Sequence, residues 1–381
     1  MKTTKWMSHG LLLVAMVLAL VGCGKSTGRT LTSATGSVYE CLVVMNDAPL
    51  TQAQLNEVAK LSLINEASGY TKPIASLYDL VEAVMAADMP CMPQVEPYFR
   101  VTKVATAQFD DMFKPTRNIL FVDINPQKYT QLKAKVSNNY WSTPQAICRI
   151  QTPSEEEFVA YWLEHGEEIR EWFVGQEIQR QTTFYRASTN KDARATLQKQ
   201  GYDILIPEDY IVVMDTVLAG ATTYSLRQPI ILENEIRVLW CCNNKGSMRR
   251  DIVVYSYPYT DANTFTLDYL NKKRDAVLSR LVKGSVEGAH MGTEYKIMPP
   301  QLRCVMVQDS AQAYEVRGLW KILKGEAMGG PYVSHTRLDQ VNARVVTAET
   351  FLYAAGQKKR TALRQAEAIL YTLTLPEDKV K

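Results

Sequence analysis

Residues 252–259, with the sequence IVVYSYPY, decide the fold of the second half of the chain. β-Branched and aromatic residues favour strands. Pro258 has no N–H to donate to a neighbouring strand, so it marks the end of the run. Successive side chains of a strand point to opposite faces, which places Tyr255, Tyr257 and Tyr259 together. Trp240, in a preceding strand-like run, is expected on the same side.

Strand-like runs continue on both sides of this stretch, with few helices between them. After a short helix expected at 191–199, helical spacing is confined to 267–282 and to a segment after Gly356 that carries an apolar face. Strands with so few crossover helices predict an antiparallel sheet with helices on one side. The runs cover residues 210–214, 222–226, 236–242, 252–257, 304–308, 313–322, 332–338 and 344–353.

The first half alternates strands and helices instead, as in an α/β domain. A capping box, Ser154 with Glu157, opens a long helix whose apolar stripe runs towards Tyr185. Gly166 and Gly175 weaken this helix by about 1 kcal/mol each relative to Ala, so a break is conceivable there. The expected strands are 38–45, 98–104, 118–124 and 146–151, and the expected helices are 55–64 and 77–89.

These patterns predict an α+β chain built from two α/β domains. We place the N-terminal α/β domain at 37–188 and the C-terminal antiparallel-sheet α/β sandwich at 189–376. Composition agrees with a globular body, because 46% of residues are hydrophobic and 22% are charged. Lys plus Arg number 43 against 40 Asp plus Glu, so no basic excess predicts nucleic acid as a partner.

The first residues have the pattern of a lipoprotein leader. Residues 1–22 combine two lysines with eleven uninterrupted apolar residues, 11–21, which is typical of a secretory signal peptide and too short to span a bilayer. The sequence Leu-Val-Gly-Cys at 20–23 is a lipobox, in which the Cys23 thiolate takes up the lipid. Residues 23–36, rich in Gly, Ser and Thr, predict a flexible tether. We therefore expect a lipid anchor at Cys23 and a position in the cell envelope, on the outer membrane facing the periplasm.

Six cysteines remain after Cys23. In an oxidising compartment they allow 15 disulfide connectivities. The alternative is that Cys41, Cys148 and Cys304, which lie in apolar strand-like runs, are small buried hydrophobes. Cys241 and Cys242 are neighbours on one strand and point to opposite faces, so they do not pair with each other. Without a Cys-x-x-Cys motif, neither redox nor zinc chemistry is predicted, and no cofactor is expected.

Candidate catalytic residues are few. Glu287 and His290 have a spacing that suits metal ligation on a helix, but the glycines around them predict a loop, and a metal site with His335 is not favoured. No Gly-x-Ser-x-Gly motif is present. Glu287 and Glu294 could serve as paired carboxylates, although forty acidic residues make such pairs common.

The densest unusual feature is aromatic. The three tyrosines of 255–259, with Arg and Trp of the segment Arg-Gly-Leu-Trp at 317–320, give a mixture common on binding surfaces. The alternative is a sheet face covered by a helix or by the N-terminal domain. The candidate binding surface comprises Tyr255, Tyr257, Tyr259, Glu287, His290, Glu294, Arg317, Trp320 and His335.

Several of these motifs, in this order and spacing, resemble DUF4837, a family of Bacteroidota lipoproteins without an assigned function. The resemblance covers residues 37–375 and implies an envelope location, but it carries over no catalytic residue. The segment 46–75 is longer than the usual connection in the family. The second half is also faintly similar to PsbP-like sandwiches. The motifs are KPTRNILFVDI at 114–124, PSEEE at 153–157, DIVVYSYPYTD at 251–261, FTLDYLNKKRDAVL at 265–278, EGAHMGTE at 287–294, EVRGLWK at 315–321, MGGPYVSHT at 328–336 and LRQAEAILYTL at 363–373.

The leading functional prediction is a non-enzymatic envelope lipoprotein that binds an envelope protein or glycan and reaches the membrane through its lipid. The alternative is an envelope hydrolase acting on glycan or peptide through Glu287, Glu294, His290 or Tyr257. A polar cleft that gathers these four side chains favours the hydrolase. An apolar groove of tyrosines favours binding.

Overall fold

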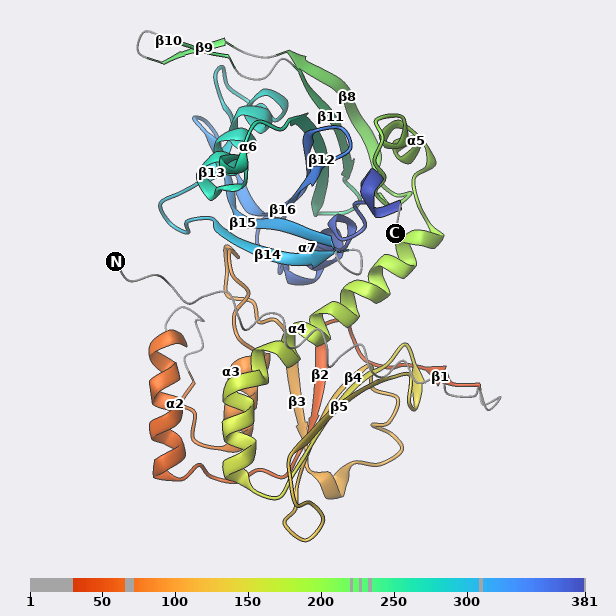
Figure 1. Ribbon diagram of the computed structural model, residues 1–381, viewed down its shortest axis with the longest axis vertical. Coiled ribbons are helices and arrows are strands. Elements are labelled where there is room, and N and C mark those ends of the chain that lie inside the picture. Colours follow the sequence, from red (N-terminus) through yellow and green to blue (C-terminus); the bar gives the residue numbers. More distant parts are fainter. Residues whose placement is uncertain are drawn as a thin grey trace.

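The computed structural model shows two bodies joined by one long helix (Figure 1). It describes residues 30–65, 72–219, 222–225, 228–231, 235–307 and 311–379. The expected signal peptide, the lipobox and Cys23 lie outside the described residues. Among the helices that the structure describes, none combines the length and the apolar composition that crossing a bilayer requires.

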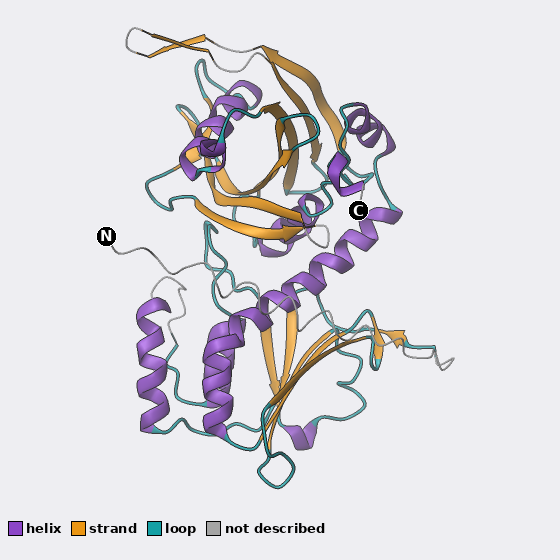
Figure 2. Ribbon diagram, in the orientation of Figure 1, coloured by secondary structure: helices purple, strands orange, loops and turns teal. Residues whose placement is uncertain are grey.

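The first body contains a five-stranded sheet in the order β3-β2-β4-β7-β5. Its strands are β2 (Glu40–Val44), β3 (Arg100–Val104), β4 (Asn118–Ile124), β5 (Lys133–Asn138) and β7 (Ala146–Thr152). The first four in the order pair in parallel, and β5 is an antiparallel edge. The connection between the parallel strands β2 and β3 carries two helices, drawn in Figure 2.

The helices of this body are α2 (Gln52–Asn65), α3 (Leu77–Met85) and α4 (Glu155–Ala187). The side chain of Ser154 accepts the N–H of Glu157 and begins α4 as the sequence predicts. Over its 33 residues, α4 extends about 50 Å at 1.5 Å per residue. The helix is unbroken at Gly166 and Gly175, so its C-terminal half leaves the first body and reaches the second (Figure 1).

The second body is dominated by an eight-stranded sheet in the order β13-β15-β16-β17-β12-β11-β8, with β14 also paired to β15. Every pairing is antiparallel, and the sheet curls strongly (Figure 2). A small hairpin of β9 and β10 follows β8. The strands are β8 (Ile211–Ala219), β9 (Thr222–Ser225), β10 (Gln228–Ile231), β11 (Glu235–Asn243), β12 (Arg249–Pro258), β13 (His290–Glu294), β14 (Gln301–Val307), β15 (Ala311–Leu323), β16 (Gly329–Asp339) and β17 (Arg344–Tyr353).

Helices pack on both faces of this sheet, which corrects the expectation of helices on one side. Helix α6 (Leu267–Leu281) shares a core with Tyr255, Tyr257 and other residues of the concave face. Helix α7 (Arg360–Leu370) packs on the opposite, convex face, together with Ile252 and Val254 of the same strand. A further helix, α5 (Lys191–Lys199), follows α4. The α+β fold class is confirmed.

The end of the expected tether is part of the first body. Strand β1 (Thr32–Ser33) pairs in parallel with β6 (Ser142–Thr143), and the N–H of Ala34 donates to the carbonyl of Thr143 at 3.0 Å. The chain is therefore held from residue 32 onward, and only the residues before it separate the folded body from Cys23.

Candidate functional site

The expected aromatic surface lies inside the second body. Tyr255 and Tyr257 are each only 2% exposed and Trp320 is 3% exposed, all beneath α6 on the concave face. Tyr259 is half-buried at the end of β12. The tyrosines therefore form a sheet face covered by a helix, which is the alternative that the sequence left open.

Arg317 and His335 lie on the convex face of the same sheet, away from the tyrosines. Both are buried, and both contact Glu315, with Arg317 Nε at 2.7 Å and His335 Nε2 at 3.2 Å from its carboxylate. Arg317 also pairs with Glu367 of α7. Successive side chains of a strand point to opposite faces of the sheet. Arg317 and His335 therefore face away from the tyrosines and cannot share a surface with them.

The remaining candidates cluster around β13. Glu287 is exposed in the turn before this strand, and His290 is half-buried with Nδ1 3.0 Å from the carbonyl of Met291. Glu294 pairs with Lys321 at 2.7 Å. Lys321 and the backbone N–H groups of Lys296 and Ile297 lower the pKa of the Glu294 carboxyl to about 2. His290 and Glu294 thus make local contacts, Glu287 is exposed, and Tyr257 lies in the core under α6, so the structure does not gather the four residues expected for a hydrolase.

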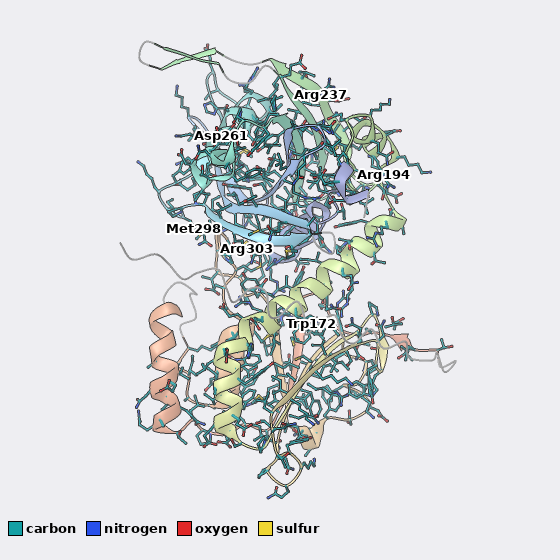
Figure 3. The ribbon with its side chains drawn as sticks, viewed as in Figure 1. Trp172, Arg194, Arg237, Asp261, Met298 and Arg303 are labelled. Carbon is teal, nitrogen blue, oxygen red and sulfur yellow. The ribbon has the colours of Figure 1, made fainter. Side chains whose placement is uncertain are left out.

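The structure instead forms a cleft of about 870 Å³ between α4 and β14, called here the α4–β14 cleft. Figure 3 labels Trp172 on the helix side and Arg303 on the sheet side. Tyr371 and Thr372, which follow α7, complete the lining. Its residues are Glu171, Trp172, Val174, Gly175, Gln176, Ile178, Gln179, Thr182, Thr183, Arg186, Arg303, Cys304, Val305, Met306, Val307, Tyr371 and Thr372.

One wall of the cleft is a single face of α4. The lining contains a row spaced three or four positions apart, 171, 175, 178, 182 and 186, together with residues next to it. One broad side of the helix therefore lines the cleft over about 22 Å. The opposite face is fixed to the first body by Glu177, a buried carboxylate that accepts three bonds from Arg117, two from Nε at 2.8 and 3.1 Å and one from NH2 at 2.8 Å. Glu177 also accepts from Asn118 at 2.8 Å and from Arg180 at 3.0 Å. These charge-assisted contacts hold the wall rigidly in place.

The other wall is the outer edge of β14. This strand pairs with β15 on one side, and no described strand pairs with its other side. Five consecutive residues, 303–307, line the cleft. Because alternate side chains of a strand point to opposite faces, a cleft that touches every residue in turn must run along the edge rather than over one face.

Ion pairs in the sheet behind the cleft fix the position of this wall. Arg303 Nε lies 2.6 Å from Glu315 and Arg303 NH1 lies 3.7 Å from Glu171 of the helix. Burial acts to raise the pKa of Glu315, but Arg317, His335 and Arg303 outweigh it and hold that pKa well below the usual range. Glu315 is therefore ionised, and its ion pair with Arg303 fixes the position of that side chain in the cleft.

Three ionisable groups that line the cleft have raised pKa values. Partial burial raises the pKa of the Cys304 thiol, and burial raises the pKa of the Tyr371 hydroxyl, so both are neutral at physiological pH. Burial acts to lower the pKa of Arg303, but Glu315 outweighs it and the net pKa is raised. Within the described part of the chain, no group of three or more His, Cys, Asp or Glu side chains is placed to hold a metal ion. The cleft can offer hydrogen bonds, apolar contact and fixed charge.

The sequence carries one signal for this site, the glycine at position 175. Gly175 lies inside the unbroken helix α4 at a stability cost, yet a Cβ at this position would meet nothing within 4 Å. Gly166 differs, because a Cβ there would lie 3.0 Å from the Trp162 ring. Packing against Trp162 thus explains why residue 166 is a glycine. No packing contact explains the glycine at position 175, which lies on the wall of the cleft.

The cysteines are free thiols throughout the described residues. Cys41 and Cys148 are buried in the first core as expected, and Cys241 and Cys242 take opposite faces of β11, with only Cys241 in the core under α7. Cys304 corrects the expectation of a buried hydrophobe, because it is exposed in the α4–β14 cleft.

Comparison with protein families divides the chain at the end of α4. Residues 188–372 match the family model DUF4837, a domain of unknown function. Residues 56–186 match a separate model, DUF8532, also a domain of unknown function. The DUF4837 match is thus confined to the second body, whereas the resemblance in sequence was expected to extend over 37–375. No curated protein matches the chain as a relative.

Proposed function

We propose that this chain, whose residues 188–372 belong to the DUF4837 family, is a non-enzymatic envelope lipoprotein. It is anchored through Cys23 and binds a partner in the α4–β14 cleft. The lipobox at 20–23 and the short apolar stretch before it support the anchor. Because residues 32–35 are already paired to the first body, only residues 24–31 separate the proposed anchor from the folded chain.

The observation that carries the proposal is the cleft itself. Ligand sites occur preferentially at domain junctions, and this cleft lies where the DUF8532 match ends and the DUF4837 body begins. Its lining joins apolar Trp172 and Ile178 to the neutral donors and acceptors of Gln176, Gln179 and Thr183. A general acid or base needs a pKa near the working pH, whereas Cys304 and Tyr371 are shifted upward and away from it. This composition favours binding over bond cleavage.

Photo-cross-linking in the native envelope tests the proposed binding site. A photoreactive phenylalanine derivative replaces Gln179, which is exposed on the cleft wall. The control replaces Glu167, which is 75% exposed on the same helix and does not line the cleft. We expect an adduct at position 179 after irradiation and none at 167. Adducts of equal yield at both positions, or at neither, would contradict a binding role for the cleft.

Replacement of the lipobox cysteine tests the anchor separately. Cys23→Ala removes the thiol that takes up the lipid, so metabolic labelling with an alkyne fatty acid is expected to disappear and the protein to leave the membrane fraction. The control is Cys304→Ala, which removes an exposed thiol of the folded body and is expected to leave both readouts unchanged. Persistent labelling of the Cys23→Ala chain would exclude the proposed anchor.

A further inference from the structure

We infer that the ligand of the α4–β14 cleft is an extended peptide segment of a partner protein, which adds as a strand to the free edge of β14. This inference rests on the proposed binding function of the cleft and specifies its ligand. Strand addition obtains affinity from main-chain hydrogen bonds to a sheet edge and specificity from pockets for alternate side chains.

The direction of the β14 backbone follows from the register of the sheet. In an antiparallel pair, opposite residues alternate between those that exchange hydrogen bonds and those whose N–H and C=O point away. Ile322 of β15 donates its N–H to Met328, on the β16 side. Even-numbered residues of β15 therefore direct their backbone groups to β16, and odd-numbered residues direct them to β14.

This alternation identifies the free backbone groups of β14. Leu302, Cys304 and Met306 stand opposite the even-numbered residues 316, 314 and 312 of β15. They take no part in the ladder with β15, so their N–H and C=O groups point to the outer edge. Cys304 and Met306 both line the cleft, and Met306 is 57% exposed. An unpaired edge of this kind is a ready template for another strand.

The dimensions of the cleft suit a single extended chain. From 303 to 307 the edge spans about 14 Å at 3.4 Å per residue, which corresponds to about five residues of ligand. The opposite wall is a helix, so a peptide seated there has a sheet edge on one side and side chains of α4 on the other. Trp172 and Ile178 offer apolar contact to ligand side chains, and Gln176 and Gln179 offer hydrogen bonds.

Gly175 provides an independent observation for close backbone approach. A mid-helix glycine costs about 1 kcal/mol relative to Ala, and nothing in the described structure lies within 4 Å of the position a Cβ would take. The position is exposed on the cleft wall. A residue without a side chain permits a ligand backbone to approach the helix, which an extended peptide lying along β14 would do.

Charge further defines the ligand. Arg186 lines the cleft near the C-terminal end of α4 and is exposed. Among the described residues it forms no ion pair, whereas Arg303 and Glu171 pair with each other at 3.7 Å. The cleft therefore presents one uncompensated positive charge, which complements a peptide that carries an acidic side chain at that end.

The test selects peptides and then asks whether they bind as a strand. Random 12-residue peptides displayed on phage are panned against the full-length chain in detergent micelles. Selected peptides that compete with cross-linking at Gln179 are synthesised, and their dissociation constants are measured by fluorescence polarisation. Cys304→Pro removes one outward N–H without removing a bond to β15. Cys304→Ser keeps that N–H and is the matched control.

Strand addition predicts that the Cys304→Pro chain binds at least tenfold more weakly than the Cys304→Ser chain, because only the serine variant keeps the outward N–H. A second measurement leaves the protein unchanged. N-Methylation of the peptide at alternate residues should abolish binding in one register and spare it in the other, because only alternate amides of a strand face β14. Arg186→Ala should weaken acidic peptides selectively.

Each outcome separates this inference from the proposed function. Equal sensitivity to methylation in both registers, together with full binding to the Cys304→Pro chain, would overturn strand addition and leave the cleft as a binding site. A library that returns no cleft-competing peptide, with an adduct at Gln179 that contains glycan or lipid, would overturn the peptide ligand and retain the proposed function. Loss of the Gln179 adduct itself would refute both. Self-association of the chain through β14, detected as dimers by sedimentation, would identify a second copy as the occupant and overturn the separate partner.

Discussion

The replacement Gly175→Ala gives a sharp test of how α4 and the cleft are built. The position is interior to a 33-residue helix, and the added methyl group would meet nothing within 4 Å. The structure therefore offers no steric cost to set against the gain in helix propensity, which is about 1 kcal/mol. We expect Gly175→Ala to raise the free energy of local opening of α4 by about that amount, or about fivefold in the equilibrium constant.

The matched replacement is Gly166→Ala in the same helix. Its Cβ would lie 3.0 Å from the Trp162 ring, which is 1% exposed and whose Nε1 donates to the carbonyl of Leu80 at 3.2 Å. The ring would have to shift against a packed core, so the propensity gain is offset by strain. Gly166→Ala is expected to give no stabilisation or a net loss.

Native-state hydrogen exchange of the α4 amides measures both effects, because it reports the opening free energy of that segment. The expected pattern is slower exchange around residue 175 in Gly175→Ala and unchanged or faster exchange around residue 166 in Gly166→Ala. Binding of a cleft ligand should weaken in Gly175→Ala, since the methyl group enters the cleft. A Gly175→Ala chain that exchanges faster than the wild type would show that this helix face is packed, and the account of the cleft wall would then be wrong.

Two further predictions concern other parts of the molecule. The buried carboxylate of Glu96 caps α7, because it accepts the N–H groups of Lys359 at 2.6 Å and Arg360 at 2.9 Å. Glu96→Ala is therefore expected to lower the free energy of unfolding by about 2 kcal/mol, measured as a lower urea midpoint. An unchanged midpoint would contradict this role. Glu294 has a folded-state pKa of about 2 against an ordinary value of 4.5, so its stabilisation is complete above pH 4.5 and is lost as the pH falls towards 2. Glu294→Gln should therefore lose less stability than the wild type between pH 6 and pH 3, and equal losses would refute the assignment.

The strands that the sequence predicted well are those in which most residues are buried. Residues 118–124 match β4 in full, and the runs at 236–242 and 252–257 lie within β11 and β12. Such apolar runs are visible without tertiary information. Strand β13, in a segment that we expected to be a loop, carries Gly292 and depends on pairing with β15. Strand β5 is exposed along most of its length. Both are specified by their neighbours more than by their own composition.

The candidate site was hidden from the sequence for a geometric reason. Its two walls, α4 and β14, are more than a hundred residues apart in the chain, and their side chains are ordinary for a surface helix and an edge strand. The three tyrosines at 255–259 indicated a binding surface because aromatic residues are concentrated there. A concentration of aromatic residues is also typical of a sheet face that is covered by a helix. A glycine that costs stability and that no packing requires is the better signal, and Gly175 is such a residue.

The cleft exists because α4 belongs to both bodies at once. Glu177 fixes the helix to β4 of the first body, and the Tyr185 hydroxyl donates to the carbonyl of Gln365 on α7 at 2.9 Å. Glu96 of the first body caps that same α7, so α7 is bonded both to α4 and to the first body. A ligand that bridges α4 and β14 would contact both bodies and favour the arrangement in which they are docked. Binding at the cleft and docking of the two bodies are therefore thermodynamically linked, and replacements that weaken docking, such as Glu96→Ala, should also weaken binding although they touch no ligand.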